Sequence, residues 1–61
     1  MKARVYLTGK GTEEDPIRPK LSNPVTWGIV KIEDNTAIIW IKDEDYEKIK
    51  DDVIEVFPDV P

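Results

Sequence analysis

The side chains of this 61-residue chain that could do chemistry are carboxylates, lysines, tyrosines and tryptophans, because the sequence contains no cysteine and no histidine. A disulfide, a cysteine–histidine zinc site, a catalytic thiol and a histidine general base are therefore excluded. Paired carboxylates could cleave glycosides, but they need a cleft that holds them at a fixed separation. A chain this short has little room for such a cleft, so we expect no enzymatic activity and no catalytic residues.

Two acidic clusters and one glycine pair are the remaining candidates for a metal or a cofactor. Glu13–Asp15 and Asp43–Asp45 lack the alternating ligand spacing and the distal bidentate glutamate of a calcium loop. Gly9-Lys10-Gly11-Thr12 echoes a phosphate-binding loop but does not have its spacing, and no helix pattern follows. We therefore expect neither a metal site nor a cofactor site.

The clearest structural signal is a hairpin that carries both tryptophans. Thr26–Glu33 and Thr36–Lys42 are rich in β-branched and aromatic residues, and only Asp34-Asn35 separates them. A two-residue turn of this kind favours positive φ at both positions, which Asp and Asn tolerate. The sequence therefore predicts an antiparallel hairpin in which Glu33 pairs with Thr36.

A regular register gives this hairpin two different faces, since alternate pairs share a face. The aliphatic face is predicted to form the core, with Gly28 closely approached by a large side chain such as Tyr46; it comprises Gly28, Val30, Ile32, Ala37, Ile39 and Ile41. The other face places an apolar centre inside a charged rim, which is typical of binding hot spots. Its candidate partner-binding residues are Trp27, Ile29, Lys31, Ile38, Trp40 and Lys42. Alternatively, the loop 9–24 covers the tryptophans with Ile17, Leu21 and its prolines.

The flanking segments complete a small α+β domain spanning residues 1–61. Ala3–Thr8 alternates as a half-buried strand, and residues 9–24 form a long loop with two glycines and three prolines. Asp43 is the expected N-cap of a short helix that ends near Lys50. Val53–Phe57 is then a last strand, with a helix continuing to Glu55 as the alternative. The predicted order is β-β-β-α-β, with a central antiparallel hairpin, the helix packed on one face of the sheet, and a short tail, 58–61.

Charge is distributed unevenly along the chain, whose net charge is −4. Residues 1–32 carry six basic and three acidic residues, whereas residues 33–61 carry three basic and ten acidic residues. The acidic total disfavours general binding to nucleic acids and anionic membranes. The longest apolar run, Ala37–Ile41, is too short to span a bilayer, and no apolar segment of a signal peptide is seen. We expect a cytoplasmic protein, and the absence of Gln and His favours a thermophilic source.

The loop contains a segment that resembles a known pattern. Gly9, Gly11, Thr12, Pro16, Arg18 and Pro19 match a G-x-G-T-x-x-x-P-x-R-P segment. This segment is similar to one in small uncharacterised proteins encoded among phage or provirus structural genes. There too it follows a first strand and precedes a Trp-containing hairpin and a short acidic helix. The resemblance implies an assembly accessory and brings no catalytic residues with it.

These patterns favour a non-enzymatic protein–protein interaction or assembly module, with a protein partner or a second copy bound at the Trp-bearing face. One alternative is a single-stranded nucleic-acid binder, in which aromatic residues stack on bases and basic residues contact phosphate. Its residues would be Tyr6, Trp27 and Trp40 with Lys2, Arg4, Lys31 and Lys42. Another alternative is a protease-inhibitor or propeptide-like domain that presents the loop 9–24.

Overall fold

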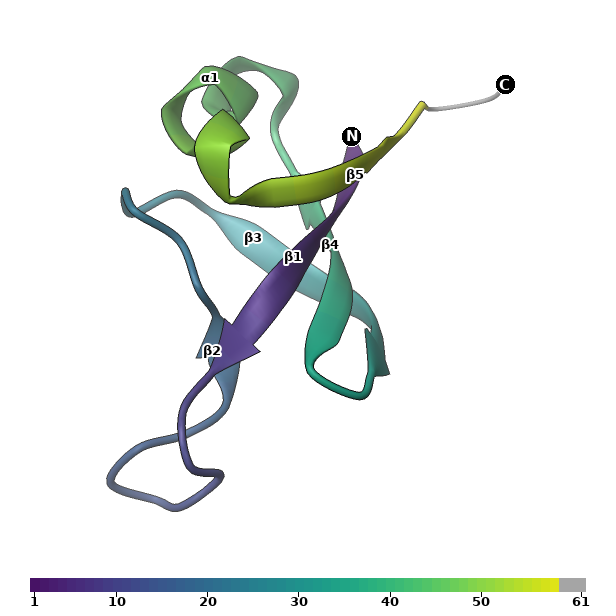
Figure 1. The fold of residues 1–61 in the computed structure, drawn as a ribbon. Coiled ribbons are helices and arrows are strands. Elements are labelled where there is room, and N and C mark those ends of the chain that lie inside the picture. The colour runs from purple at the N-terminus through teal and green to yellow at the C-terminus, as the bar shows by residue number, and fades with distance from the viewer. Residues whose placement is uncertain (59–61) are drawn as a thin grey trace.

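A strongly curved antiparallel sheet makes up most of the computed structural model, which describes residues 1–58 (Figure 1). Its strands are β1 (Lys2–Thr8), β2 (Arg18–Pro19), β3 (Trp27–Glu33), β4 (Thr36–Ile41) and β5 (Val53–Phe57). β4 pairs with β1 and β3, and both β5 and the short β2 pair with β1. β3 therefore forms one edge of the sheet, and β5 with β2 forms the other.

A short helical segment connects β4 to β5 and lies at one end of the sheet (Figure 1). It consists of a 3₁₀ turn over Asp43–Asp45, the helix α1 (Tyr46–Ile49) and a second 3₁₀ turn over Lys50–Asp52. The strand predicted at Val53–Phe57 is confirmed, and the alternative of a helix reaching Glu55 is wrong. None of the helices in residues 1–58 is long and apolar enough to cross a membrane.

The predicted N-cap at Asp43 is wrong, because Asp43 is the first residue of the 3₁₀ turn itself. The cap position is Lys42, whose side chain makes no capping hydrogen bond. The Asp43 carboxylate instead accepts a hydrogen bond from the amino group of Met1 at 3.0 Å. A charged donor is a stronger partner for a carboxylate than a backbone amide, and it draws the side chain away from the turn.

The core lies between the inner face of the sheet and the helical segment. Fully buried apolar side chains come from β1, β4 and α1, namely Ala3, Val5, Ala37, Ile39, Ile41 and Ile49. Leu21, Val25 and Tyr46 are among the partly buried residues that pack against this cluster. The predicted α+β class, with a mostly antiparallel sheet and one short helix, is confirmed. The element order differs from the prediction, because β2 adds a strand within the loop.

The hairpin β3–β4 follows the predicted register only near its turn. Glu33 pairs with Thr36, Ile32 with Ala37 and Lys31 with Ile38. A β-bulge then leaves Val30 unpaired and shifts the remaining pairs to Ile29–Ile39, Gly28–Trp40 and Trp27–Ile41. A bulge adds one residue to one strand, so every side chain beyond it changes face relative to a regular strand.

The aliphatic core face predicted for the hairpin is confirmed as buried on β4, whereas its β3 residues are not buried, although Ile32 does lie opposite Ala37 as predicted. The side chains of Val30 and Ile32 are 50% and 54% exposed, because β3 is an edge strand and no element covers it. The predicted contact of Tyr46 with Gly28 is also wrong, since no atom lies within 4 Å of the position a Gly28 Cβ would take. In the turn, Asp34 has a positive φ of 51°, and Asn35 does not.

A second irregularity lies at the opposite edge of the sheet. In the pairing of β1 with β5, Arg4 opposes Glu55 and Val5 opposes Val53, so Ile54 has no partner in the ladder. The side chains of Ile54 and Val56 are exposed at this edge. β3 and β5, which lie at opposite edges of the sheet, thus each contain one extra residue.

The loop 9–24 divides into two parts at β2. The part before β2 projects away from the sheet (Figure 1), and its Ile17 is exposed. The part after β2 is held against the helical segment, because Asp52 Oδ2 accepts hydrogen bonds from the amide and the hydroxyl of Ser22, both at 2.7 Å. Asn23 Nδ2 also donates to the carbonyl of Lys48. Except for Pro58, the predicted tail 58–61 lies outside the described residues.

Candidate interaction surface

The bulge at Val30 places the two tryptophans on opposite faces of the sheet. Trp27 and Ile29 pair with core residues of β4, so their side chains lie on the inner face. Trp40, Ile38 and Lys31 lie on the outer face, and Lys42 follows the end of β4 and is exposed. The single surface expected from a regular register is therefore not formed. A binding role for each of these residues stays a prediction.

The edge strand β3 carries the main concentration of exposed apolar side chains among the described residues. Trp27, Ile29, Val30 and Ile32 are all large, and their exposed fractions lie between 39% and 54%. The loop 9–24 does not cover the tryptophans, although its second part borders a hollow of about 430 Å³ next to Trp27. Edge strands also present unpaired backbone donors and acceptors to solvent. β3 thus combines an apolar surface with free hydrogen-bonding groups.

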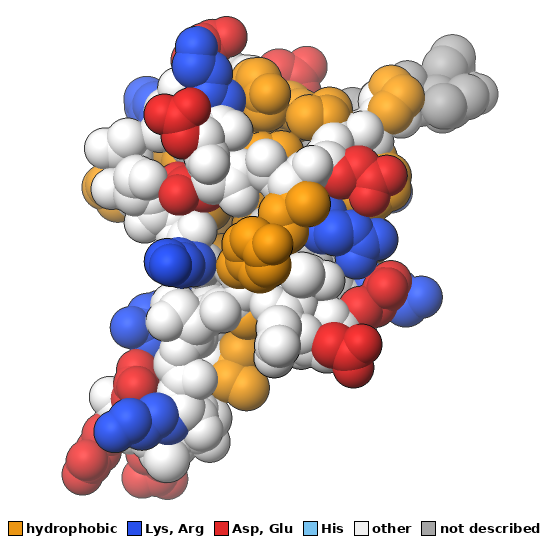
Figure 2. All heavy atoms as spheres, in the orientation of Figure 1, with side chains coloured by type: hydrophobic (Ala, Val, Ile, Leu, Met, Phe, Trp, Pro, Cys, Tyr) orange, Lys and Arg blue, Asp and Glu red, His pale blue; other side chains and the backbone are white. Residues whose placement is uncertain are grey.

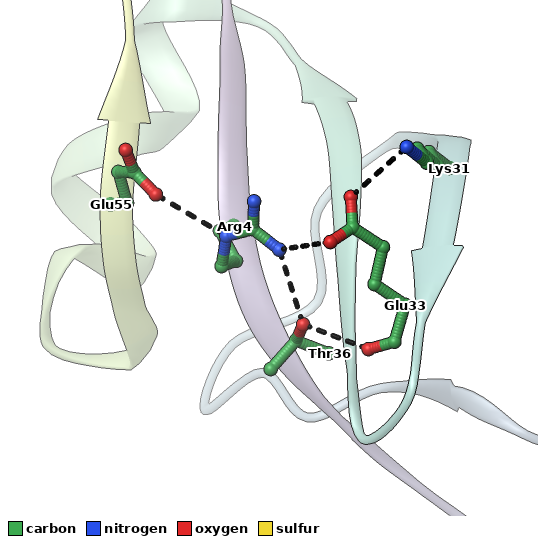
Figure 3. Close-up of polar contacts among 5 residues, drawn as sticks. All are labelled: Arg4, Lys31, Glu33, Thr36 and Glu55. Atoms are coloured by element: carbon green, nitrogen blue, oxygen red, sulfur yellow. Dashed lines mark hydrogen bonds and ion pairs between the residues drawn. The ribbon is translucent and has the colours of Figure 1, made fainter.

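The outer face of the sheet is organised around Arg4 of β1 (Figure 3). Arg4 Nε contacts Glu55 Oε1 of β5 at 3.3 Å, and Nη1 contacts Glu33 Oε2 of β3 at 3.5 Å. Nη1 also donates to the hydroxyl of Thr36 in β4, at 3.3 Å. The guanidinium lies 5.6 Å from the centre of the Phe57 ring, within cation–π range. One side chain therefore connects four strands.

The charges around Arg4 largely balance. Two carboxylates face its guanidinium, and Lys31 Nζ lies 3.4 Å from Glu33 Oε1. The face viewed in Figure 2 accordingly shows hydrophobic side chains in a broken band between positive and negative groups. A central arginine already engaged by carboxylates is a poor open site for phosphate. This geometry fits a structural role better than a catalytic one.

The part of the loop before β2 is built by the residues of its glycine–proline segment. Gly9 has a φ of 108°, and a Cβ on it would lie 2.2 Å from the carbonyl oxygen of Pro16. The hydroxyl of Thr12 accepts a hydrogen bond from the amide of Asp15, and Arg18 Nη1 donates to the Pro16 carbonyl at 2.9 Å. Pro19 is buried in β2. The residues of the glycine–proline segment thus determine the conformation of the loop before β2.

The same loop does not offer a phosphate site. The backbone amides of Lys10, Gly11 and Thr12 all point at the carbonyl oxygen of Asp15, at 3.0, 3.0 and 3.3 Å. A phosphate-binding loop needs such amides free to face the ligand. Here the three amides bond to the carbonyl oxygen of Asp15 and close the loop, so they do not face a ligand.

Comparisons with protein-family models, with curated protein sequences and with solved structures found no match to this chain. What the domain does must therefore be inferred from its own surface.

Proposed function

We propose that this domain is a non-enzymatic interaction or assembly module that binds a protein surface through the exposed apolar residues of β3, together with Trp40. The observation that supports it is the uncovered row Trp27, Ile29, Val30 and Ile32 on an edge strand. Exposed apolar clusters of this kind mark interaction sites in soluble proteins. Tryptophan is also among the residues that supply most of the binding energy at interfaces.

The composition of the chain strengthens this proposal. Charged residues make up 36% of the sequence, yet residues 25–30 contain none. This uncharged stretch includes the first half of β3 and the residues just before it. The resemblance of residues 9–19 to small phage- or provirus-associated proteins agrees with an assembly role.

Replacement of each tryptophan by serine tests the proposal. Trp27 and Trp40 are 39% and 44% exposed, so each replacement should lower the free energy of unfolding of the monomer by about 1–2 kcal/mol. Sedimentation velocity over a concentration series should show association of the native chain that Trp27→Ser weakens. A loss of about 3–5 kcal/mol in a strictly monomeric protein would identify both tryptophans as core residues and contradict the proposal.

A second candidate, single-stranded nucleic-acid binding, is favoured by one feature of the outer face. Lys2 and Tyr6 of β1 lie on the same face as Trp40, which pairs with Lys2 in the ladder. Aromatic and basic side chains on one sheet face are typical of such binders. A gel shift with single-stranded oligonucleotides at low ionic strength tests it, because phosphate contacts are strongest there. Absence of binding under those conditions would eliminate this function.

A further inference from the structure

We propose that residues 21–25 form a strap that opens while the rest of the domain stays folded, and that Asp52 is the latch that holds it closed. The strap lies between β2 and β3 and passes beside the helical segment (Figure 1). Its opening joins the hollow next to Trp27 to the core surface beneath the strap. The inference concerns a motion of the domain and goes beyond the proposed binding through β3.

The strap is attached to the rest of the domain by few hydrogen bonds. Within residues 1–58 it makes three, and all of them reach the helical segment. Two come from Ser22 and end on the same oxygen, Asp52 Oδ2. Asn23 donates the third to the carbonyl of Lys48, at 2.6 Å. All three are exposed, so water can replace each partner when the strap lifts. Because bonds to a charged acceptor are the stronger ones, the carboxylate of Asp52 is the main attachment.

The two attachment points, at Lys48 and Asp52, lie on either side of Ile49 in the sequence of the helical segment. Ile49 is a core residue and is only 1% exposed. Leu21 and Val25, at the two ends of the strap, pack against the core cluster that includes Ile49. The strap therefore covers this part of the core, and its opening gives solvent access to Ile49.

Open space borders the strap along its whole length. The hollow of about 430 Å³ is lined by Trp27 and by all five residues of the strap. The three residues between Leu21 and Val25 are exposed, so only the two end residues contribute apolar contacts. Few buried apolar contacts and solvent-exposed hydrogen bonds are the features of segments that open locally. The strap has both features, whereas the sheet beneath it is held by continuous ladders.

An introduced cysteine measures this opening, since the native chain has none. We expect the thiol of Ile49→Cys to react with iodoacetamide at a rate that changes little at low urea concentration. The reason is that the effect of urea scales with the surface exposed, and an opening strap exposes far less than an unfolding domain. Ile39→Cys is the matched control, because Ile39 is also fully buried but lies on β4, which has a strand on both sides. Its thiol should react more slowly and with a steep urea dependence. Equal urea dependences in the two variants would overturn the proposal.

Asp52→Ala, introduced into the Ile49→Cys protein, tests the latch. It removes the acceptor of two of the three hydrogen bonds of the strap, so the thiol should react about tenfold faster. Asp51→Ala is the matched control, since Asp51 is an exposed neighbour in the same 3₁₀ turn and its loss changes the net charge equally. It should change the rate by less than about threefold. Equal acceleration by the two variants would show that Asp52 is not the latch and would overturn the proposal.

Hydrogen exchange in the native chain tests the motion without any substitution, in case the cysteine variants do not fold. The amide of Ser22 is bonded to the latch, whereas the amide of Leu7 in β1 donates to the carbonyl of Asn35 at 2.8 Å. The Ser22 amide should be about tenfold or more less protected than the Leu7 amide, and its exchange should depend little on urea. The same protection and the same urea dependence at both amides would mean that the strap opens only when the domain unfolds, which overturns the proposal. That result would leave the proposed binding through β3 unaffected.

Discussion

Asp34 is the only non-glycine residue among the described residues that has a positive φ. A left-handed conformation costs most residues about 1–2 kcal/mol, and Asp is less penalised because its short side chain can bond locally. Glycine avoids the cost altogether. The hairpin turn therefore contains one position where glycine is favoured and, at Asn35, one where it is not.

Glycine substitutions at these two positions should have opposite effects. We expect Asp34→Gly to raise the free energy of unfolding by up to about 1 kcal/mol, because it removes left-handed strain. Asn35→Gly should lower it by about 0.5 kcal/mol, since added backbone freedom is lost on folding without any relief of strain. Urea unfolding of both variants measures the difference. A stabilised Asn35→Gly would mean that the turn conformation differs from the one described.

At the scale of elements, the loop 9–24 shows how a segment without strand or helix periodicity is fixed. Before β2 it closes on the carbonyl of Asp15, and after β2 it is tied to the helical segment through Ser22 and Asp52. The tie also brings Leu21 and Val25 onto the core. The first attachment joins residues three to five positions apart, whereas the second joins residues 30 positions apart in the sequence.

Alanine substitutions at the two loop glycines should distinguish the loss of stability caused by a steric clash from the loss caused by a positive φ. Both have positive φ, at 108° for Gly9 and 81° for Gly11. A Cβ at Gly9 would collide with the backbone of Pro16, whereas one at Gly11 meets only the side chain of Ile17 at 3.5 Å. We expect Gly11→Ala to cost about 1 kcal/mol and Gly9→Ala about 2–3 kcal/mol. Thermal melts compare the stabilities of the two variants. Equal losses of stability would contradict a specific contact of Gly9 with Pro16.

The tie between Ser22 and Asp52 should make stability depend on pH. Hydrogen bonds from the Ser22 hydroxyl, and then from its amide, lower the pKa of Asp52 below its usual 3.8. Because the carboxylate is favoured in the folded state, its contribution is present above that value and is lost as the pH falls through the lowered pKa. Ser22→Ala should raise the pKa of Asp52 and reduce the loss of stability below pH 4. NMR titration of the Asp52 carboxyl group in both proteins tests this.

A structural feature of this chain could be predicted from the sequence when residues close together in the sequence determine it. Strand positions, the two-residue turn and the buried face of β4 follow from short patterns, so they were predictable. The bulge did have a signal, because Ile29 and Val30 break the alternation of β3 with two adjacent apolar residues. The network around Arg4 had none, since it joins residues from four strands that only the sheet topology brings together.

For the whole molecule, self-association through the exposed apolar residues of β3 would link stability to concentration. A partner that binds only the folded state raises the apparent melting temperature as its concentration increases. The melting temperature of the native chain should therefore rise across a concentration series, while that of Ile29→Glu should stay constant. Differential scanning calorimetry measures both. A constant value for the native chain would show that association does not contribute to its stability.

The extra residues in β3 and β5 also bear on the solubility of the chain. An unbroken edge strand can template the growth of fibrils, and a bulge interrupts the regular backbone pattern that each added strand must match. Val30 and Ile54 interrupt the two edges, so pairing at either edge is confined to a few residues. Deletion of Val30 should restore a continuous, strongly apolar edge and convert the protein into one that forms thioflavin-binding aggregates.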